Sequence, residues 1–191
     1  MLIYNFFGKL FTSKYKKSYS EAGEDKVIDK ILNKVVRGFY VDVGANNPTE
    51  LSNTHFFYRK GWNGINIDAL PGSMKKFNDV RSRDINLEIP ISDKQEVLKY
   101  YMFSRSAHNS FSEEIAIERA TKLIGTKDLQ TEKLSSILDK HLKNREIDFM
   151  TIDVEGLDFK VIKSNDWTKY RPKLIVVELF GRGVEEVAEN E

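Results

Sequence analysis

Apolar residues follow two different spacings in the first quarter of the chain. Between Glu24 and Gly38 they recur every three or four positions, as one face of an α-helix requires. These positions are Val27, Ile28, Ile31, Leu32 and Val35. Residues 39–43 are then almost continuously apolar, interrupted only by Asp42. Such a short run predicts a strand buried on both faces, so the pattern changes from helix to strand at Gly38.

The same two patterns alternate through the rest of the chain. Further strands are predicted at residues 65–68, 85–91, 147–154 and 173–179, the second of them near the sheet edge because it contains a proline. Helices are predicted at residues 52–60 and 71–80, from Leu134 to Leu142 with Thr131 as the cap, and around Val161. Residues 97–103 predict a hairpin arm, and residues 104–126 give only a polar loop and a helix from Ser112. This order predicts a mostly parallel, doubly wound α/β sheet.

Composition narrows the class of protein. Of the 191 residues, 40% are hydrophobic and 31% are charged, which is typical of a globular domain. With 30 Lys and Arg against 29 Asp and Glu, the overall charge gives no sign of nucleic-acid binding. The sequence has no cysteine, which excludes disulfides, thiolate metal sites and a Cys nucleophile. A cytoplasmic location is the simplest interpretation. We expect a basic and aromatic segment at 1–19 and one domain at 20–191.

The first 17 residues combine apolar and basic side chains. Leu2, Phe6, Phe7 and Leu10 are interleaved with lysines, and no acid precedes Glu21. No small-residue cleavage site follows, so a signal peptide is not predicted, and no apolar run is long enough to span a bilayer. Two interpretations stay open. Residues 1–17 form either a short amphipathic segment on an anionic membrane surface, or a helix or frayed tail beside the domain.

Acids follow or end the predicted strands. They are Asp42, Asp68, Asp93, Asp153 and Glu178. In an open parallel sheet, ligands bind beyond the carboxyl ends of the strands, so we expect these side chains at one rim. Gly44 lets the chain pass close to a ligand, and Asp68 ends the strand that holds a nucleoside's ribose. An ordinary turn explains Gly44 alone, but the two residues together predict a nucleoside site.

The loop after Gly44 narrows the type of nucleoside. Ala45-Asn46-Asn47-Pro48 follows, so the G-x-G-x-x-G spacing that brings a pyrophosphate onto a helix N-terminus is absent. This absence disfavours a nicotinamide-dependent oxidoreductase, which stays an alternative. It leaves room for S-adenosylmethionine, a nucleoside without a pyrophosphate.

Several segments resemble, in order, the FkbM-type methyltransferases. Residues 38–46, Gly-Phe-Tyr-Val-Asp-Val-Gly-Ala-Asn, resemble the first motif of that family, and residues 61–68 resemble the second strand of a bacterial branch. Residues 20–25 are similar to that branch's Ser-Gln-x-Gly-Glu-Asp segment, with Glu21 in place of Gln. Residues 152–156 resemble the family's Asp-Val-Glu-Gly signature. The similar stretch covers most of the chain.

The resemblance implies a Rossmann-like class I methyltransferase fold that uses S-adenosylmethionine to O-methylate a sugar or another small hydroxyl compound. It implies donor contacts at Asp42, Gly44, Ala45 and Asn46 for the amino-acid end, at Asp68 and Ala69 for the ribose, and at Ser92 and Asp93 for the adenine. Asp68-Ala69 stands where the family usually has Glu-Pro, so the carboxylate side chain is one methylene shorter.

A hydroxyl acceptor must lose its proton to a general base or with help from a metal. Asp153 and Glu155 are candidate bases, because the fourth strand of this architecture ends beside the methyl group, and His108 is a third candidate from a loop. Asp153, Glu155 and Glu178 are also candidate ligands for Mg²⁺, which prefers oxygen. Alternatively, Asp153 caps a turn, Glu155 supports a helix start and His108 is a surface residue.

The predicted sheet ends earlier than the class I fold usually does. About a dozen residues follow the strand at 173–179, where two further strands are expected. The last strands are missing, the chain is truncated, or a partner completes the edge, and an exposed apolar edge could also join two copies. A non-catalytic or truncated methyltransferase-like binding domain therefore stays an alternative to an enzyme with a small-molecule or glycan acceptor.

Overall fold

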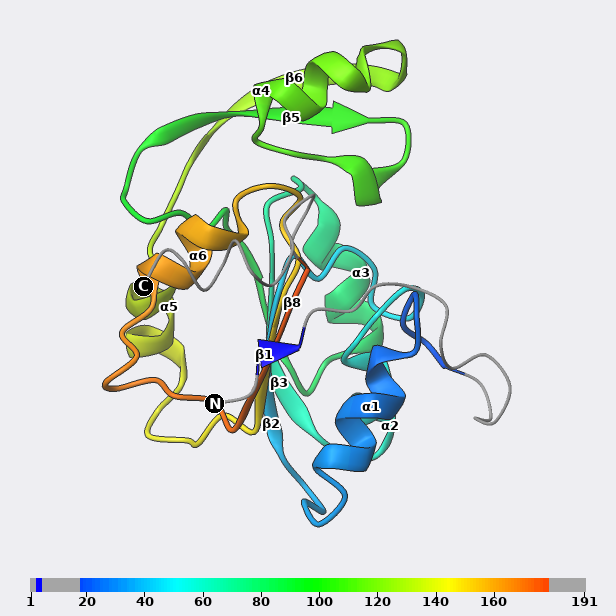
Figure 1. Cartoon of the computed structure of the whole chain (residues 1–191), viewed down its shortest axis with the longest axis vertical. Coiled ribbons are helices and arrows are strands. Elements are labelled where there is room, and N and C mark those ends of the chain that lie inside the picture. Colours follow the sequence, from blue (N-terminus) through cyan, green and yellow to red (C-terminus); the bar gives the residue numbers. More distant parts are fainter. Residues whose placement is uncertain (1–2, 5–17, 179–191) are drawn as a thin grey trace.

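The computed structural model describes residues 3–4 and 18–178, and its centre is a six-stranded sheet (Figure 1). Every pairing in this sheet is parallel, in the order β1-β8-β7-β2-β3-β4. The strands are β1 (Ile3–Tyr4), β2 (Phe39–Val43), β3 (Asn63–Asp68), β4 (Ile85–Glu88), β7 (Phe149–Ile152) and β8 (Leu174–Val177). β4 lies at one edge, as predicted for the strand at residues 85–91, although it ends at Glu88, before the proline.

Helices cover both faces of this sheet. One face carries α1 (Glu24–Ile31), α2 (His55–Arg59) and α3 (Ser73–Val80), and the other carries α5 (Leu134–His141) and α6 (Asp158–Ser164) (Figure 1). Successive side chains of β2 point to opposite faces. Val41 therefore packs in the cluster that contains Ile137 of α5, whereas Tyr40 packs in the cluster of Ile28 and Phe57. The predicted doubly wound, Rossmann-like sheet is confirmed.

Residues 97–130 form a separate layer above the carboxyl ends of the strands (Figure 1). β5 (Val97–Phe103) and β6 (Leu123–Gln130) pair antiparallel, and between them lie η1 (Ser106–His108), α4 (Glu113–Glu118) and η2 (Ala120–Lys122). This confirms the hairpin arm and the helix start at Ser112, whose hydroxyl accepts the Ile115 N–H. β6 was not predicted, because most of its side chains are exposed and no apolar alternation marks it.

Thr131 is not the cap of α5, so that prediction is wrong. Its hydroxyl donates to the carbonyl oxygen of Lys94 at 2.8 Å, and it accepts the N–H of Glu96 at 3.0 Å. Thr131 thus joins the end of the hairpin layer to the loop after β4. The hydroxyl oxygen of Ser164, in α6, accepts the Leu134 N–H at 3.1 Å instead.

The last strand has a partner within the chain. Ile3 and Tyr4 of β1 pair with Ile175 and Val176 of β8, so these two positions of the predicted amphipathic segment belong to a strand. Residues 5–17 of that segment and residues 179–191 lie outside the described residues. Association of two copies through a sheet edge stays a prediction. In the described part of the chain, no helix has the length and apolar character needed to cross a membrane.

Candidate functional site

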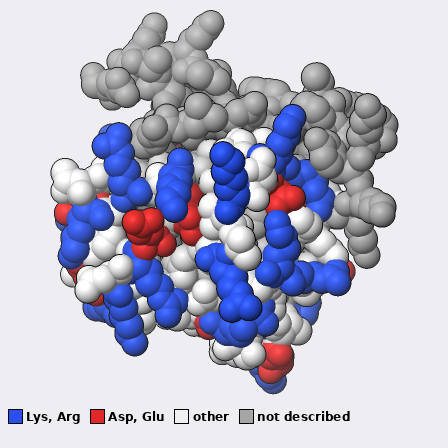
Figure 2. All heavy atoms as spheres, turned by 90° about the horizontal axis from the view of Figure 1, so that it is seen from below, with Lys and Arg blue, Asp and Glu red and all other residues white. Residues whose placement is uncertain are grey.

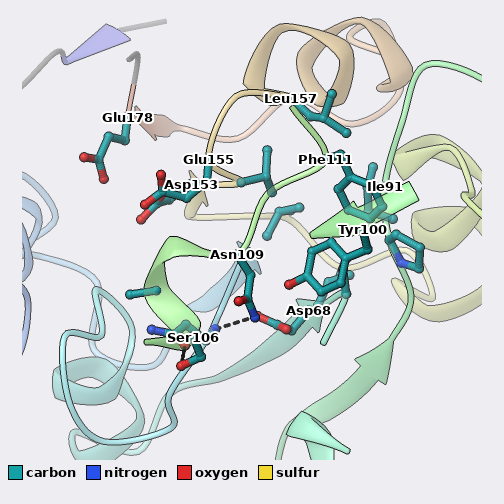
Figure 3. A pocket seen from close by; sticks show the side chains of 18 of the residues that line it. Asp68, Ile91, Tyr100, Ser106, Asn109, Phe111, Asp153, Glu155, Leu157 and Glu178 are labelled. Carbon is teal, nitrogen blue, oxygen red and sulfur yellow. Dashed lines mark hydrogen bonds between the residues drawn. The ribbon is translucent and has the colours of Figure 1, made fainter. Parts of the chain in front are cut away.

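A cavity lies at the carboxyl edge of the sheet, beneath the hairpin layer (Figure 3). It contains about 860 Å³ of empty space when the part that is open to solvent is counted. The ends of β2, β3 and β7 contribute Gly44, Asp68 and Asp153, and the hairpin layer contributes Tyr100 and Asn109. This is the edge at which ligands of open α/β sheets bind.

Asp68 lies at the end of β3 and lines the cavity, as predicted. The backbone N–H of Asn46 donates to Oδ2 of Asp68, and the N–H of Leu70 donates to Oδ1, both at 2.8 Å. Burial raises the pKa of this carboxyl, and these hydrogen bonds counteract the rise. A carboxylate has about four acceptor positions, so Asp68 keeps acceptor capacity. Asn46 and Ala69, also predicted, line the cavity beside it.

Gly44 is required by the packing of two strands as much as by a ligand. Its φ of +88° lies in the left-handed region, and a Cβ on it would overlap the carbonyl oxygen of Asp153. The Asp153 N–H in turn donates to the carbonyl of Val43 at 2.9 Å. Only glycine allows this approach, so Gly44 fixes the position of Asp153 relative to β2.

Asp42 and Ala45, predicted as donor contacts, do not line the cavity. Asp42 points to the face of the sheet covered by α1 to α3, where the Thr54 hydroxyl donates to its Oδ2 at 2.6 Å. Burial raises the pKa of Asp42 to about 6. Arg81 lies beneath the loop after β2. It donates hydrogen bonds to the Thr54 hydroxyl at 2.7 Å and to the Pro48 carbonyl at 2.7 Å. Asp42 therefore belongs to a buried network that supports the loop after β2.

Ala45 is buried in a small cluster with Met74 and Phe77 of α3. Its side chain therefore contributes to packing beneath the loop. Asp42 points to one face of the sheet, and the turn that begins at Gly44 places Ala45 against α3, so these two side chains miss the cavity while Gly44 and Asn46 reach it.

Ser92 and Asp93 were predicted to flank an adenine, but neither lines the cavity. Ser92 is fully buried, and its N–H donates to the Glu132 carbonyl at 3.0 Å. Its hydroxyl donates to Asp93 at 3.2 Å. The wall is formed instead by the preceding residues, 89–91, Ile-Pro-Ile. The loop after β4 thus lines the cavity through residues that precede the two predicted ones.

Asp153 and Glu155 lie close together at the far end of the cavity from Asp68, and Glu178 completes this acidic wall (Figure 3). Burial raises the pKa of Asp153 well above its usual value, and the carboxylates of Glu178 and Glu155 raise it further. Burial also raises the pKa of Glu155, to about 7, although Arg119 opposes the shift. Nη1 of Arg119 donates to Oε2 of Glu155 at 3.2 Å.

The turn after β7 has a different cap from the one considered in the sequence. Asp158 accepts the N–H groups of Val154 at 3.0 Å and Gly156 at 3.2 Å, so Asp158 caps the turn and Asp153 does not. Glu155 has a left-handed φ of +50°, and the Ser110 hydroxyl donates to its carbonyl oxygen at 2.5 Å. Since left-handed backbone is costly for a residue with a side chain, it is held here by its surroundings.

The predicted Mg²⁺ site receives no support. Within residues 3–4 and 18–178, no group of three or more His, Asp or Glu side chains has an arrangement that could hold a metal ion. Arg119 already pairs with Glu155, and Glu178 is exposed. Asp153, Glu155 and Glu178 line one cavity without forming a coordination shell.

His108 lies beside the cavity without lining it, unlike its neighbours Ser106, Ala107 and Asn109. Partial burial, together with the charges of Arg119 and Arg105, lowers the pKa of His108. Its role as a base receives no support from this placement.

Several residues of the cavity were missed in the sequence. Tyr100 of β5 is buried, and its ring lies 4.6 Å from that of Phe111, between centroids. Leu157 adds apolar surface, and Glu21 reaches the cavity from the segment before α1. The aromatic residues belong to the stretch without clear periodicity, so only their chemical type could have marked them.

Comparison with known proteins tests the resemblance. A family model, the methyltransferase FkbM domain, matches residues 42–190. The match covers more than half of the chain, from the end of β2 through β8, and includes most residues that line the cavity. No curated protein and no solved structure gives a significant match. The chain therefore belongs to the FkbM methyltransferase family, whose members use S-adenosylmethionine as methyl donor.

Proposed function

We propose that the protein transfers a methyl group from S-adenosylmethionine to a hydroxyl of a sugar or another small metabolite. The observation that carries this proposal is a single cavity with two unlike ends. One end has a buried carboxylate beside an aromatic pair, and the other end has the carboxyl groups of Asp153 and Glu155 (Figure 3). The first suits a nucleoside, and the second suits removal of a proton.

The end around Asp68 fits the donor. Each oxygen of Asp68 accepts one backbone N–H, which leaves capacity for the two ribose hydroxyls. Tyr100, Phe111 and Ile91 offer apolar and aromatic surface to the adenine. When bound, S-adenosylmethionine supplies a methyl group whose bonding electrons stay on sulfur as the new carbon–oxygen bond forms. The residues of this end align the donor with the acceptor.

Glu155 and Asp153 have different roles at the other end of the cavity. With a pKa of about 7, Glu155 is about half ionised at neutral pH and takes the proton of the acceptor hydroxyl, which suits a general base. The pKa of Asp153 is raised further by burial and by its acidic neighbours. Asp153 therefore holds its proton more strongly than an ordinary aspartic acid does, which suits a hydrogen-bond donor. Such divergent environments are typical of acid and base pairs.

The charge of the cavity favours an uncharged acceptor. Among the described residues that line it, every charged side chain is an acid. They are Glu21, Asp68, Asp153, Glu155 and Glu178. These acids would repel an acceptor with a phosphate or carboxylate. A neutral sugar has hydroxyl groups that can donate hydrogen bonds to them. The lack of cysteine supports the further proposal of a reducing, cytoplasmic location.

The first test is calorimetric titration with S-adenosylmethionine, run beside NAD. We expect binding of the former alone. Asp68→Ala should weaken it by about 1.5–3 kcal/mol, as for the loss of charge-assisted hydrogen bonds. Since Ala leaves two backbone N–H groups without acceptors, Asp68→Asn serves as a milder variant. Unchanged affinity in both folded variants would contradict the ribose assignment, and binding of NAD alone would restore the oxidoreductase alternative.

Acceptor identity requires a separate screen. Neutral glycosides should accept a methyl group from labelled donor, and the corresponding sugar phosphates should react more slowly. If the protein binds the donor and methylates no hydroxyl compound, the binding-domain alternative stands.

A further inference from the structure

The five connections that lead from helices into strands gather positive charge at the amino edge of the sheet, opposite the cavity. They comprise residues 32–38, 60–62, 81–84, 142–148 and 165–173. Nine Lys and Arg residues are exposed in these connections, namely Lys34, Arg37, Lys60, Arg83, Lys143, Arg145, Lys169, Arg171 and Lys173. Only two acids, Glu146 and Asp166, are exposed there. Figure 2 shows Lys and Arg side chains spread over much of this face.

Most of these cations are not neutralised by ion pairs. Lys60 pairs with Asp29, Lys169 with Asp139, and Lys173 with Glu146 and Asp148. The other six have no acidic partner within 4.0 Å in the part of the chain that the structure describes; they are Lys34, Arg37, Arg83, Lys143, Arg145 and Arg171. The overall charge of +1 conceals this concentration of charge.

An apolar side chain projects from the same face. The connection between α1 and β2 extends furthest below the sheet in Figure 1. Val36 lies in this connection with 81% of its surface exposed, the largest exposed fraction among the large apolar residues of the described chain. Lys34 and Arg37 flank it. An exposed apolar residue between cations is typical of a segment that enters a lipid interface.

We propose that this amino-edge face docks on an anionic lipid surface, with Val36 inserted among the head groups. The cations come from five connections and spread over a broad face, which suits many lipid head groups better than one small anion. Each contributes through the surface potential of the lipid. A nucleic acid would use the same cations but offers no apolar phase for Val36. The proposal is independent of methyl transfer.

Docking through this edge orients the cavity. The strands run from the amino edge to the carboxyl edge, and the cavity opens beyond the latter. A docked molecule therefore turns its cavity away from the lipid. Its acceptor would come from the aqueous side, and a sugar attached directly to a lipid of the same leaflet would not reach the cavity.

Single-cysteine labelling tests the contact directly, because the chain has no native cysteine. Val36→Cys carries an environment-sensitive fluorophore, and Ile124→Cys, exposed by 70% on β6 at the opposite end, is the matched control. Both full-length proteins are mixed with vesicles of phosphatidylcholine alone, or of three parts phosphatidylcholine to one part phosphatidylglycerol. We expect a blue shift at position 36 only, with anionic vesicles only.

Charge variants provide a second measurement. In co-sedimentation with the anionic vesicles, Lys34→Gln with Arg37→Gln should lower the partition coefficient about 25-fold, since each basic residue near the surface contributes roughly a fivefold factor. Lys99→Gln with Lys127→Gln, on the hairpin layer, should change it less than twofold. High salt should release the wild-type protein.

Any of four results would overturn the proposal. The first is no binding to anionic vesicles at low salt. The second is a shift at position 124 without one at 36, which would show docking through the hairpin layer. The third is equal loss of binding in the two charge variants. Binding to a soluble polyanion such as heparin, without binding to vesicles, would also overturn it and point to a nucleic acid or an acidic protein.

Discussion

The two edges of this sheet are built from the same kinds of loops and differ in charge. At the amino edge, exposed cations outnumber exposed acids by nine to two. Among the described residues, the connections that leave β2, β3, β4 and β7, together with the residue after β8, contain six acids and a single cation, Lys94. The acids are Glu50, Asp93, Glu96, Asp153, Glu155 and Glu178. The net charge of a chain therefore says little about any one of its surfaces.

Acids at the two edges also titrate differently. Burial raises the pKa of Glu155 to about 7 at the carboxyl edge. At the other end, hydrogen bonds from Lys169 and Tyr170 lower the pKa of Asp139, and hydrogen bonds from Thr168 lower that of Asp166. Surroundings, and not the type of residue, decide the direction. This contrast identifies the edge where carboxyl groups are suited to exchange protons.

The largest expected effect concerns Gly44, where the carboxyl edge depends on close packing. Gly44→Ala forces a Cβ against the Asp153 carbonyl, so we expect a loss of at least about 3 kcal/mol in the free energy of unfolding, together with loss of donor binding. Gly72→Ala is the control, because Gly72 has a similar φ of +85° and no heavy atom within 4 Å of its virtual Cβ. That control should cost only about 1–2 kcal/mol in urea denaturation. Equal losses in the two variants would show that the left-handed backbone, and not the contact with Asp153, is the reason for glycine at position 44.

The next effect separates chemistry from binding. Glu155→Gln should lower kcat by about 10²–10⁴, as expected for removal of a general base, and should leave S-adenosylmethionine affinity nearly unchanged. Asp153→Asn should slow turnover less, because the amide still donates a hydrogen bond. Glu50→Gln, at the same edge and outside the cavity, is the control. Normal turnover of both cavity variants would remove these acids from the mechanism.

A smaller effect concerns the pH dependence of stability. The pKa of Glu155 is raised from 4.5 to about 7 on folding. The raised pKa stabilises the folded protein, and this contribution to the free energy of unfolding is fully present below pH 4.5 and is lost as the pH rises through 7. Wild type should therefore lose about 1 kcal/mol more than Glu155→Gln between pH 5 and 8, after allowance for solvent screening. At the amino edge, Asp166→Asn should change the slope of the free energy of unfolding against pH in the opposite sense, and it should do so at acidic pH. Denaturation curves measured from acidic pH to pH 8 compare the two variants, and parallel slopes for wild type and Glu155→Gln would contradict the raised pKa of Glu155.

The smallest effect is expected at the amino edge. Lys173 pairs with Asp148 at 2.7 Å, and Asp148 also accepts the Phe39 N–H at 2.8 Å. Lys173→Met should cost about 0.5–1 kcal/mol, because the lysine is half exposed. Arg171→Gln, which removes an unpaired charge, should leave the melting temperature unchanged. A larger cost at Arg171 would mean that this face contributes to folding as well as to recognition.

The buried elements of the fold were predictable from the sequence. β2 matched the predicted residues, 39–43, because a strand buried on both faces has an apolar run that no helix of that length shows. The helices were placed correctly, but α1 ends earlier than predicted, and α2 and α3 begin later than predicted. β6 was missed, since a two-stranded layer exposed to solvent needs no apolar alternation.

The candidate site was predictable in part. Gly44 and Asp68 could be identified because a close approach and a strand end limit the residue types that fit. Side-chain direction could not be inferred at Asp42 and Ala45, which point into the domain. The aromatic wall of Tyr100 and Phe111 depends on how the hairpin layer folds back over the sheet, and this long-range contact leaves no local pattern.

Among the described residues, charge is separated along the sheet, with cations at the amino edge and acids around the cavity. S-adenosylmethionine carries a sulfonium charge that is absent after methyl transfer. If the protein transfers the methyl group as proposed, the acids around the cavity attract the donor from a distance and hold the spent product less strongly. The field would then favour turnover at two stages, faster encounter and easier release, and both advantages would decline as ionic strength increases.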